Sequence, residues 1–445
     1  MNLRWLILKI LDAIEFEGIF VHEAIERFTG EQDLSKQDRA FIKKVVFGTI
    51  EQQLRIDYVI NQFSKIKVNQ MKPAIRLTLR LSVYQLLYME NIPDSAVCNE
   101  AVKLIKKRKM HRLTGFVNGV LRALIRQKDN IQYPNNDDLL DYLSVKYSFK
   151  PEIIQLLLDE YQEDVVENFL SVSNEQAPLT IRVQETNITK QGLIKALEKE
   201  GISVSEGQYI DEAMHISQID KINLLDSFNQ GYFQVQDESS MMVADVGFEE
   251  GMTCVLDLCA APGGKTMHLA DKLKGQGQVF AFDISDKKLD RIRENYARLG
   301  LENIRTSLND ARVINQDFIG VGDLVIADLP CSGLGIIRKK PDIKWHITVD
   351  RIKTLKKLQQ DMLDVAKNYV KPGGVLIYST CTVTRTENQD NIAWFLKHNR
   401  DFDLEPIQKN YSDLQTGMVT MMPISNGPDG FFIAKLRKKC ENVNS

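Results

Sequence analysis

Two cysteines hold matching positions in separate segments of the chain. Cys331 follows an apolar run through Asp-Leu-Pro-Cys-Ser-Gly, and Cys381 follows another through Tyr-Ser-Thr-Cys-Thr. Both runs are typical of buried strands, so each thiol is expected just beyond the carboxyl end of a strand. One cysteine in such a place is usually a packing residue. Two of them in neighbouring loops, one in the same motif as Asp328, indicate a common chemical site.

A pair of thiols beside a carboxylate suits methylation at C5 of cytosine. C5 is a poor nucleophile, but a thiolate that adds to C6 makes it enamine-like. A proton or hydrogen bond at N3 eases this addition, and Asp328 is placed to supply it. A free thiol with a pKa of about 8.5 is mostly protonated at neutral pH, so the site must activate it. Neither cysteine motif contains a histidine, so the activating group is not apparent.

A cofactor site is expected at the same edge of the sheet. The glycines that follow the first strand let the backbone approach a ligand closely, but the first glycine of a nucleoside-triphosphate loop is missing. Three later strands end near Asp283, Asp310 and Asp328, and a carboxylate at the second strand can accept both hydroxyls of a ribose. Three carboxylates disfavour a pyrophosphate and suit a cationic nucleoside, so we predict S-adenosylmethionine. The cofactor loop comprises Cys259, Ala260, Ala261, Pro262, Gly263, Gly264 and Lys265.

The elements that carry these residues alternate between strands and helices from about residue 237. This alternation is typical of a doubly wound, Rossmann-like α/β domain, which we place at 237–440. In such sheets ligands bind beyond the carboxyl ends of the strands. The last run, 430–438, is expected to be a strand near the sheet edge. Gly373-Gly374 predicts a turn before the strand that leads to Cys381.

Two other domains are predicted ahead of it. Residues 1–130 contain apolar residues at helical spacing and few Gly or Pro, which predicts an all-α domain. Residues 137–236 begin with another helical stretch and continue as a small α+β module of short strands around one helix.

Charge is distributed unevenly between these parts. Residues 1–130 hold 22 Lys/Arg and 14 Asp/Glu, a net charge of +8, whereas the whole chain has −3. A basic front suggests a polyanionic partner. We predict RNA binding at the densest basic cluster, where helical spacing could set side chains along a phosphate backbone; a solvated helix face is the alternative. The cluster comprises Lys103, Lys106, Lys107 and Arg108.

The surroundings of the protein follow from what the sequence lacks. Its six cysteines show no Cys/His spacing that suits zinc, so no metal is expected. No apolar run approaches the roughly 20 residues of a membrane span, and charged residues interrupt the apolar start of the chain. We therefore expect a cytoplasmic protein that has no contact with a membrane, and we also expect a monomer.

The motifs resemble those of a known family. Cys259-Ala-Ala-Pro-Gly-Gly-Lys265, Asp328-Leu-Pro-Cys-Ser-Gly333 and Ser379-Thr-Cys-Thr382 look like motifs I, IV and VI of the RNA cytosine-C5 methyltransferases. The helical front resembles a NusB-type RNA-binding domain, so the resemblance extends over essentially the whole chain. It implies a class I methyltransferase domain, an RRM-like middle module, S-adenosylmethionine as cofactor and 16S ribosomal RNA as partner.

The resemblance also implies roles for residues. Cys381 would attack C6, and Cys331 would assist breakdown of the adduct and release of RNA. Cys259 to Lys265, Asp283, Asp310 and Asp328 would contact the cofactor or the target base. Leu329 stands where alanine is more usual, and residues 423–430 lack a histidine often found there. These departures affect the shape of the base pocket, and hence the exact target.

Other functions compete with this one. A cytosine in another ribosomal RNA site or in tRNA is an alternative target. DNA cytosine-C5 methyltransferases also use a Pro-Cys thiol, but there it is the nucleophile. An RNA-binding scaffold without catalysis is a further alternative. An amino-group methyltransferase would need Asp-Pro-Pro-Tyr where Asp-Leu-Pro-Cys stands.

Overall fold

The computed structural model describes residues 2–219, 221–408 and 416–440. The chain forms two compact units. The first comprises Met1–Asn174 and Ile337–Thr348, and the second comprises Glu175–Ile336 and Val349–Ser445. Among the described residues, no helix combines the length and the apolar character that crossing a membrane requires.

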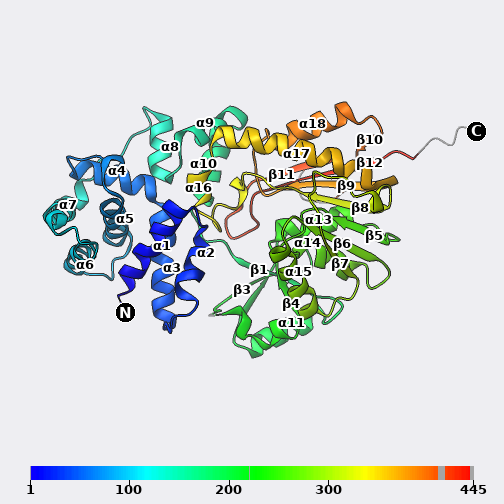
Figure 1. Ribbon diagram of the computed structural model, residues 1–445, viewed down its shortest axis with the longest axis horizontal. Helices are drawn as coiled ribbons and strands as arrows, with labels where there is room; N and C mark the ends of the chain where they lie inside the picture. Colours follow the sequence, from blue (N-terminus) through cyan, green and yellow to red (C-terminus); the bar gives the residue numbers. More distant parts are fainter. Residues whose placement is uncertain (1, 220, 409–415, 441–445) are drawn as a thin grey trace, which may run out of the picture. The chain divides into compact units, whose positions relative to one another are not determined.

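The first unit is helical, as the sequence predicted. Its central helix α5 (Pro73–Tyr88) is buried on nearly every side and packs against α1, α3, α4, α6 and α7 (Figure 1), as expected for a helix that is apolar all round. In order, its helices of more than four residues are α1 (Leu3–Glu17), α2 (Val21–Thr29), α3 (Lys36–Glu51), α4 (Gln53–Phe63), α5, α6 (Asp94–Lys107), α7 (Thr114–Arg126), α8 (Leu139–Tyr147), α9 (Pro151–Glu160) and α10 (Glu163–Val172).

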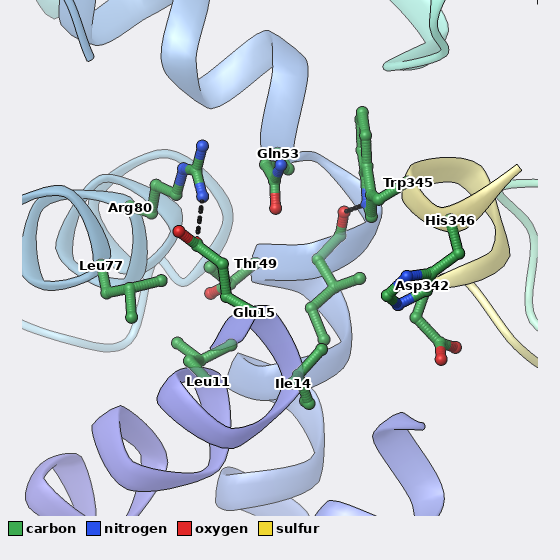
Figure 2. A pocket seen from close by; sticks show the side chains of 11 residues that line it. Leu11, Ile14, Glu15, Thr49, Gln53, Leu77, Arg80, Asp342, Trp345 and His346 are labelled. Carbon is green, nitrogen blue, oxygen red and sulfur yellow. Dashed lines mark hydrogen bonds and ion pairs between the residues drawn. The ribbon is translucent and has the colours of Figure 1, made fainter. Parts of the chain in front are cut away.

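A short segment from far along the sequence completes this unit. It carries α16 (Ile343–His346), where Trp345 Nε1 donates a hydrogen bond to the Ile50 carbonyl at 2.8 Å. The Lys344 ammonium donates to the carbonyls of Glu51 and Tyr147, at 3.3 Å each. Figure 2 shows Trp345 and His346 beside side chains of α1 and α3, around a cavity of about 230 Å³. The segment starts only six residues after Cys331, so the loop of one cysteine continues into the helical unit.

A small antiparallel sheet opens the second unit, in the order β2-β3-β1-β4. The buried guanidinium of Arg182 in β1 donates to Asp271 at 3.0 Å, which ties this sheet to the helix that follows the cofactor loop. The predicted strand and helix order is confirmed. The elements are β1 (Leu179–Val183), α11 (Lys190–Lys199), β2 (Ser203–Glu206), β3 (Ala213–Ser217), α12 (Asp226–Asn229) and β4 (Phe233–Val235).

The large sheet has the order β10-β12-β9-β8-β5-β6-β7, with β11 paired to β12. Strands β7, β6, β5, β8 and β9 are parallel, and β12 is antiparallel. Its strands are β5 (Cys254–Asp257), β6 (Gln278–Asp283), β7 (Ile304–Leu308), β8 (Gly322–Asp328), β9 (Val370–Thr380), β10 (Phe402–Leu404), β11 (Met418–Met421) and β12 (Phe431–Lys438).

Helices cover both faces of this sheet (Figure 1). Alternate residues of β5 face opposite ways: Val255 packs in the cluster of α13, α14 and α15, and Leu256 in the cluster of α17 and α18. Such burial on both faces is typical of a doubly wound sheet, so the predicted fold class is confirmed. The helices are α13 (Glu238–Gly247), α14 (Gly264–Lys272), α15 (Asp286–Leu299), α17 (Val349–Tyr369) and α18 (Gln389–His398).

One detail differs from the sequence-based expectation. Gly373-Gly374 does not separate α17 from the strand, because β9 already begins at Val370 and passes through the glycines opposite an irregularity in β8. The expectation for the last strand is confirmed: β12 lies near the sheet edge, next to the short edge strand β10.

Candidate active site

The two cysteines meet at the ends of adjacent parallel strands. Asp328 of β8 pairs in register with Ser379 of β9, so the loops that carry Cys331 and Cys381 start side by side. Their Sγ atoms lie 3.3 Å apart. The structure therefore brings together the two thiols that the sequence placed at strand ends.

The environment of Cys331 favours its protonated form. The hydrogen bond with Cys381 and burial raise the pKa of the Cys331 thiol well above its usual range. A thiol that keeps its proton can donate it in a hydrogen bond, and the neighbouring acceptor is the Cys381 sulfur. Such a bond stabilises negative charge on Cys381, the form of a cysteine that acts as a nucleophile.

Asp328 is held by two donors before any ligand arrives. Lys265 Nζ lies 2.7 Å from one carboxylate oxygen and Ser379 Oγ lies 2.8 Å from the other. Burial disfavours the charge of Lys265, but the Asp328 carboxylate outweighs this effect and raises the pKa of the ammonium. The Lys265 ammonium also lies 5.4 Å from the centre of the Phe431 ring. An ion pair with a fixed geometry thus borders the thiols.

The cofactor loop makes a tight connection between β5 and α14. Gly263 has φ +100°, and a Cβ there would lie 2.6 Å from Met267 Cε, so the backbone needs glycine. Asp257, at the end of β5, accepts from Thr266 Oγ1 at 2.7 Å. Burial raises its pKa to about 6, and its Oδ1 has no hydrogen-bond partner among the described residues. Burial also raises the pKa of the Cys259 thiol, so this cysteine keeps its proton.

Asp283 lies beside this loop, whereas Asp310 is engaged elsewhere. Asp283 is buried and lies 3.4 Å from the Ala261 amide, which donates to it. Asp310 follows β7 by two residues and binds the Arg312 guanidinium at 2.6 Å, which lowers the pKa of the carboxyl. The buried Asp283 carboxylate suits the ribose hydroxyls of S-adenosylmethionine, and the glycines of the cofactor loop let a nucleoside lie against the backbone. The positive charge of Lys265 is paired with the Asp328 carboxylate.

The predicted RNA-binding cluster lies at the end of α6, and some of its side chains already contact other residues of the first unit. Lys103 pairs with Glu100 at 2.6 Å. Lys107 lies 4.3 Å from the centre of the Trp5 ring, and Arg108 forms an ion pair with Asp12. Lys106 is exposed. The four cations are thus near one another, but two of them also stabilise α1.

One group at the site was missed by the sequence analysis. Glu387 is fully buried behind both cysteine loops and accepts hydrogen bonds from the backbone and the hydroxyl of Ser332. It lies in a polar stretch after motif VI, where nothing in the local pattern separates a buried acid from an exposed one.

Three family models match the chain. The 16S rRNA methyltransferase RsmB/F model matches residues 247–437, the NusB family model matches 1–126, and the model of the RsmF/B-like ferredoxin-like domain matches 153–223. These matches agree with the fold class of each part of the chain.

Individual relatives give the same result. The probable ribosomal RNA small subunit methyltransferase B of Bacillus subtilis is 32% identical, covering 98% of this chain and 99% of the relative. The ribosomal RNA small subunit methyltransferase B of Proteus mirabilis is 30% identical with the same coverage. The crystal structure of PH0851 superimposes with a TM-score of 0.81 at 27% identity, over 98% of each chain. NSun6 from Pyrococcus horikoshii with SFG shares the fold over 66% of this chain and 99% of its own, at 23% identity and a TM-score of 0.59.

Proposed function

Because the chain belongs to the 16S rRNA methyltransferase RsmB/F family, we propose that it methylates C5 of one cytosine in 16S ribosomal RNA through Cys381. It is an S-adenosylmethionine-dependent RNA methyltransferase. The observation that carries the proposal is the pair of thiols 3.3 Å apart beside an aspartate. An amino-group methyltransferase has no use for a thiol at this place, and a scaffold without catalysis has no use for the assembled site.

The reaction proposed for the thiols has two stages. The Cys381 thiolate forms a bond to C6, and the electron pair of the C5–C6 double bond moves to C5 and into the ring, so that C5 can accept a methyl cation equivalent. Afterwards the C5 proton leaves to a base, the double bond re-forms, and the C6–Sγ bond breaks with its electrons on sulfur. A protonated Cys331 supports both stages, because its hydrogen bond stabilises the Cys381 thiolate as attacking and as leaving group.

The proposed task of Asp328 is to accept a hydrogen bond from N3 of the base when N3 carries a proton, because a carboxylate accepts and does not donate. Its carboxylate is already fixed by Lys265 and Ser379. A group that is held in place loses little freedom when the base binds, which is the advantage of a preorganised site. The ion pair with Lys265 also compensates part of the cost of burying the carboxylate.

The proposed cofactor contacts are residues 259–265, Asp283 and Asp310. S-adenosylmethionine supplies the methyl group as an electrophilic sulfonium. Asp283 would accept the ribose hydroxyls, and the loop at Gly263 would let the nucleoside approach the backbone. Asp310 contributes less in this proposal, because Arg312 already neutralises it.

We also propose which cytosine of the RNA is methylated. Cytosine 967 of 16S ribosomal RNA is the expected target, and another ribosomal RNA or tRNA cytosine is the alternative. The basic cluster of α6 remains the proposed RNA contact, with Lys103 and Lys106 as the members that do not contact Trp5. We further expect a cytoplasmic monomer without a metal.

Bisulfite sequencing of ribosomal RNA tests this function. A cytosine methylated at C5 resists deamination, so one protected position in 16S RNA should lose its protection when the gene is deleted and regain it when the gene is restored. Unchanged protection throughout 16S RNA would reject it as the substrate. A loss of protection in tRNA or in another ribosomal RNA would select the alternative target.

Removing the carboxylate of Asp283 should weaken cofactor binding. Hydrogen bonds to a charged group contribute about 1.5–3 kcal/mol, so Asp283→Ala is expected to reduce the affinity for S-adenosylmethionine by roughly 10- to 100-fold. Isothermal titration calorimetry measures this. The control is Asp286→Ala, an exposed acid in the first turn of α15, which should bind like the parent protein. Equal affinity of both variants would remove Asp283 from the cofactor site.

A further inference from the structure

The Glu387 carboxylate is hydrogen-bonded on both oxygens to the loop of Cys331. Its Oε1 accepts from the Ser332 amide at 2.9 Å, and its Oε2 accepts from the Ser332 hydroxyl at 2.5 Å. Gln359 of α17 donates to Oε1 at 3.1 Å and to the Pro330 carbonyl at 3.0 Å. The residues before and after Cys331 are therefore both anchored, and Glu387 is 0% exposed.

The next residue, Asn388, holds the other cysteine in the same way. Its Oδ1 accepts from Thr380 Oγ1 at 2.6 Å, and its Nδ2 donates to the Thr382 carbonyl at 3.0 Å. Thr380 and Thr382 are the neighbours of Cys381 on either side. Two consecutive residues thus anchor the flanks of both thiols.

A hydroxyl pair joins the two loops directly, and its proton directions depend on Glu387. Ser332 Oγ and Thr382 Oγ1 lie 2.7 Å apart. A hydroxyl has one proton to donate, and that of Ser332 goes to the carboxylate at 2.5 Å. The Thr382 hydroxyl must therefore be the donor to Ser332. An ionised Glu387 fixes this chain of hydrogen bonds in one direction.

We propose that Glu387 and Asn388 are positioning residues that fasten the Cys331 loop to the Cys381 loop and so fix the separation of the two thiols. The Glu387 carboxylate also accepts from Thr384 Oγ1, three residues after Cys381, at 3.0 Å, so this one side chain contacts both loops. This proposal rests on the proposed function only for its consequence in catalysis; the geometry of the thiols is a property of the protein alone.

The charge of Glu387 has a second effect that distinguishes it from a purely structural acid. Besides the hydrogen bond to Cys381 and burial, the negative charge of Glu387 contributes to raising the pKa of Cys331. Other ionisable groups near the pair include Lys265, which interacts with Cys381 and binds Asp328, and Tyr378, which interacts with Cys331 and with Glu387. Removing the charge should therefore make Cys331 easier to deprotonate.

Two measurements test the proposal: thiol labelling as a function of pH, and single-turnover methylation of RNA. The pH dependence of iodoacetamide labelling at Cys331, read by peptide mass spectrometry on the full-length protein, reports thiolate formation. Glu387→Gln should shift the midpoint downward and slow single-turnover methylation of 16S RNA by roughly 10-fold or more, with an unchanged KM for RNA. Thr382→Val keeps the shape and all charges, so it should slow methylation without moving the midpoint.

The controls separate this proposal from the proposed function. Glu250→Gln, an exposed acid, should match the parent protein in labelling and methylation. An unshifted midpoint together with parental methylation in Glu387→Gln would overturn the proposal. A shifted midpoint in a protein whose parent methylates no RNA would support the brace and reject the function. If Glu387→Gln does not fold, Thr382→Val decides alone: slowed methylation supports the brace, and parental methylation overturns it.

Discussion

Cys381→Ala is expected to abolish both methyl transfer and the covalent complex with RNA. Without the thiolate, nothing adds to C6, and C5 stays too weak a nucleophile to accept a methyl group. Loss of a catalytic nucleophile typically costs many orders of magnitude, so the single-turnover rate should fall on the order of 10⁴-fold or more. Transfer of labelled methyl groups to a 16S RNA fragment measures the rate, and a denaturing gel measures the complex.

The matched control is another thiol of the same chain. Cys440 is exposed and lies after the last strand, so Cys440→Ala should retain the parental rate. Binding of S-adenosylmethionine should be equal in both variants, because Cys381 is not part of the cofactor loop. Methylation by Cys381→Ala at a parental rate would contradict the assignment of the nucleophile.

Cys331→Ala is expected to behave in the opposite way and to accumulate a covalent RNA–protein complex. Cys381 can still attack, but the leaving sulfur loses the hydrogen bond across 3.3 Å that stabilises it as it departs. Elimination should therefore become slower than addition, with turnover falling by roughly 10²-fold or more. A shifted band on a denaturing gel, sensitive to ribonuclease, reports the complex.

This variant also decides between the two possible orders of the thiols. In DNA cytosine-C5 methyltransferases the Pro-Cys thiol is the nucleophile, so a protein of that type would lose its adduct with Cys331→Ala. A complex that forms in Cys331→Ala and is absent in Cys381→Ala supports the proposed order. The reverse pattern would exchange the two roles.

The strand ends were predictable because buried strands are continuous apolar runs. The runs that precede Asp283, Asp328 and Cys381 each end in polar residues, and the carboxyl ends of parallel strands meet at one edge. The thiols and the cofactor loop could thus be placed at one site. The short strands β10 and β11 could not be predicted, because they are stabilised by pairing with β12 rather than by a pattern of their own.

Contacts between distant segments were not predictable from local sequence. Residues 337–348 lie within the predicted catalytic domain but belong to the first compact unit, since Trp345 and Lys344 find carbonyl acceptors there.

The hydrogen bonds of the buried Glu387 carboxylate could not be predicted from the local sequence either. Glu387 receives hydrogen bonds from Ser332 and from Gln359, which come from a different loop and a different helix. An acid surrounded by Thr, Arg, Asn and Gln has the local composition of an exposed loop. Only the assembled fold shows that this carboxylate is enclosed.

The most direct measurement of the central claim is mass spectrometry of the complex trapped by Cys331→Ala. After digestion with trypsin and ribonuclease T1, we expect a short oligonucleotide of 16S RNA sequence linked through a cytosine to the peptide that contains Cys381. A nucleotide linked to any other residue, or a base other than cytosine on Cys381, would contradict it.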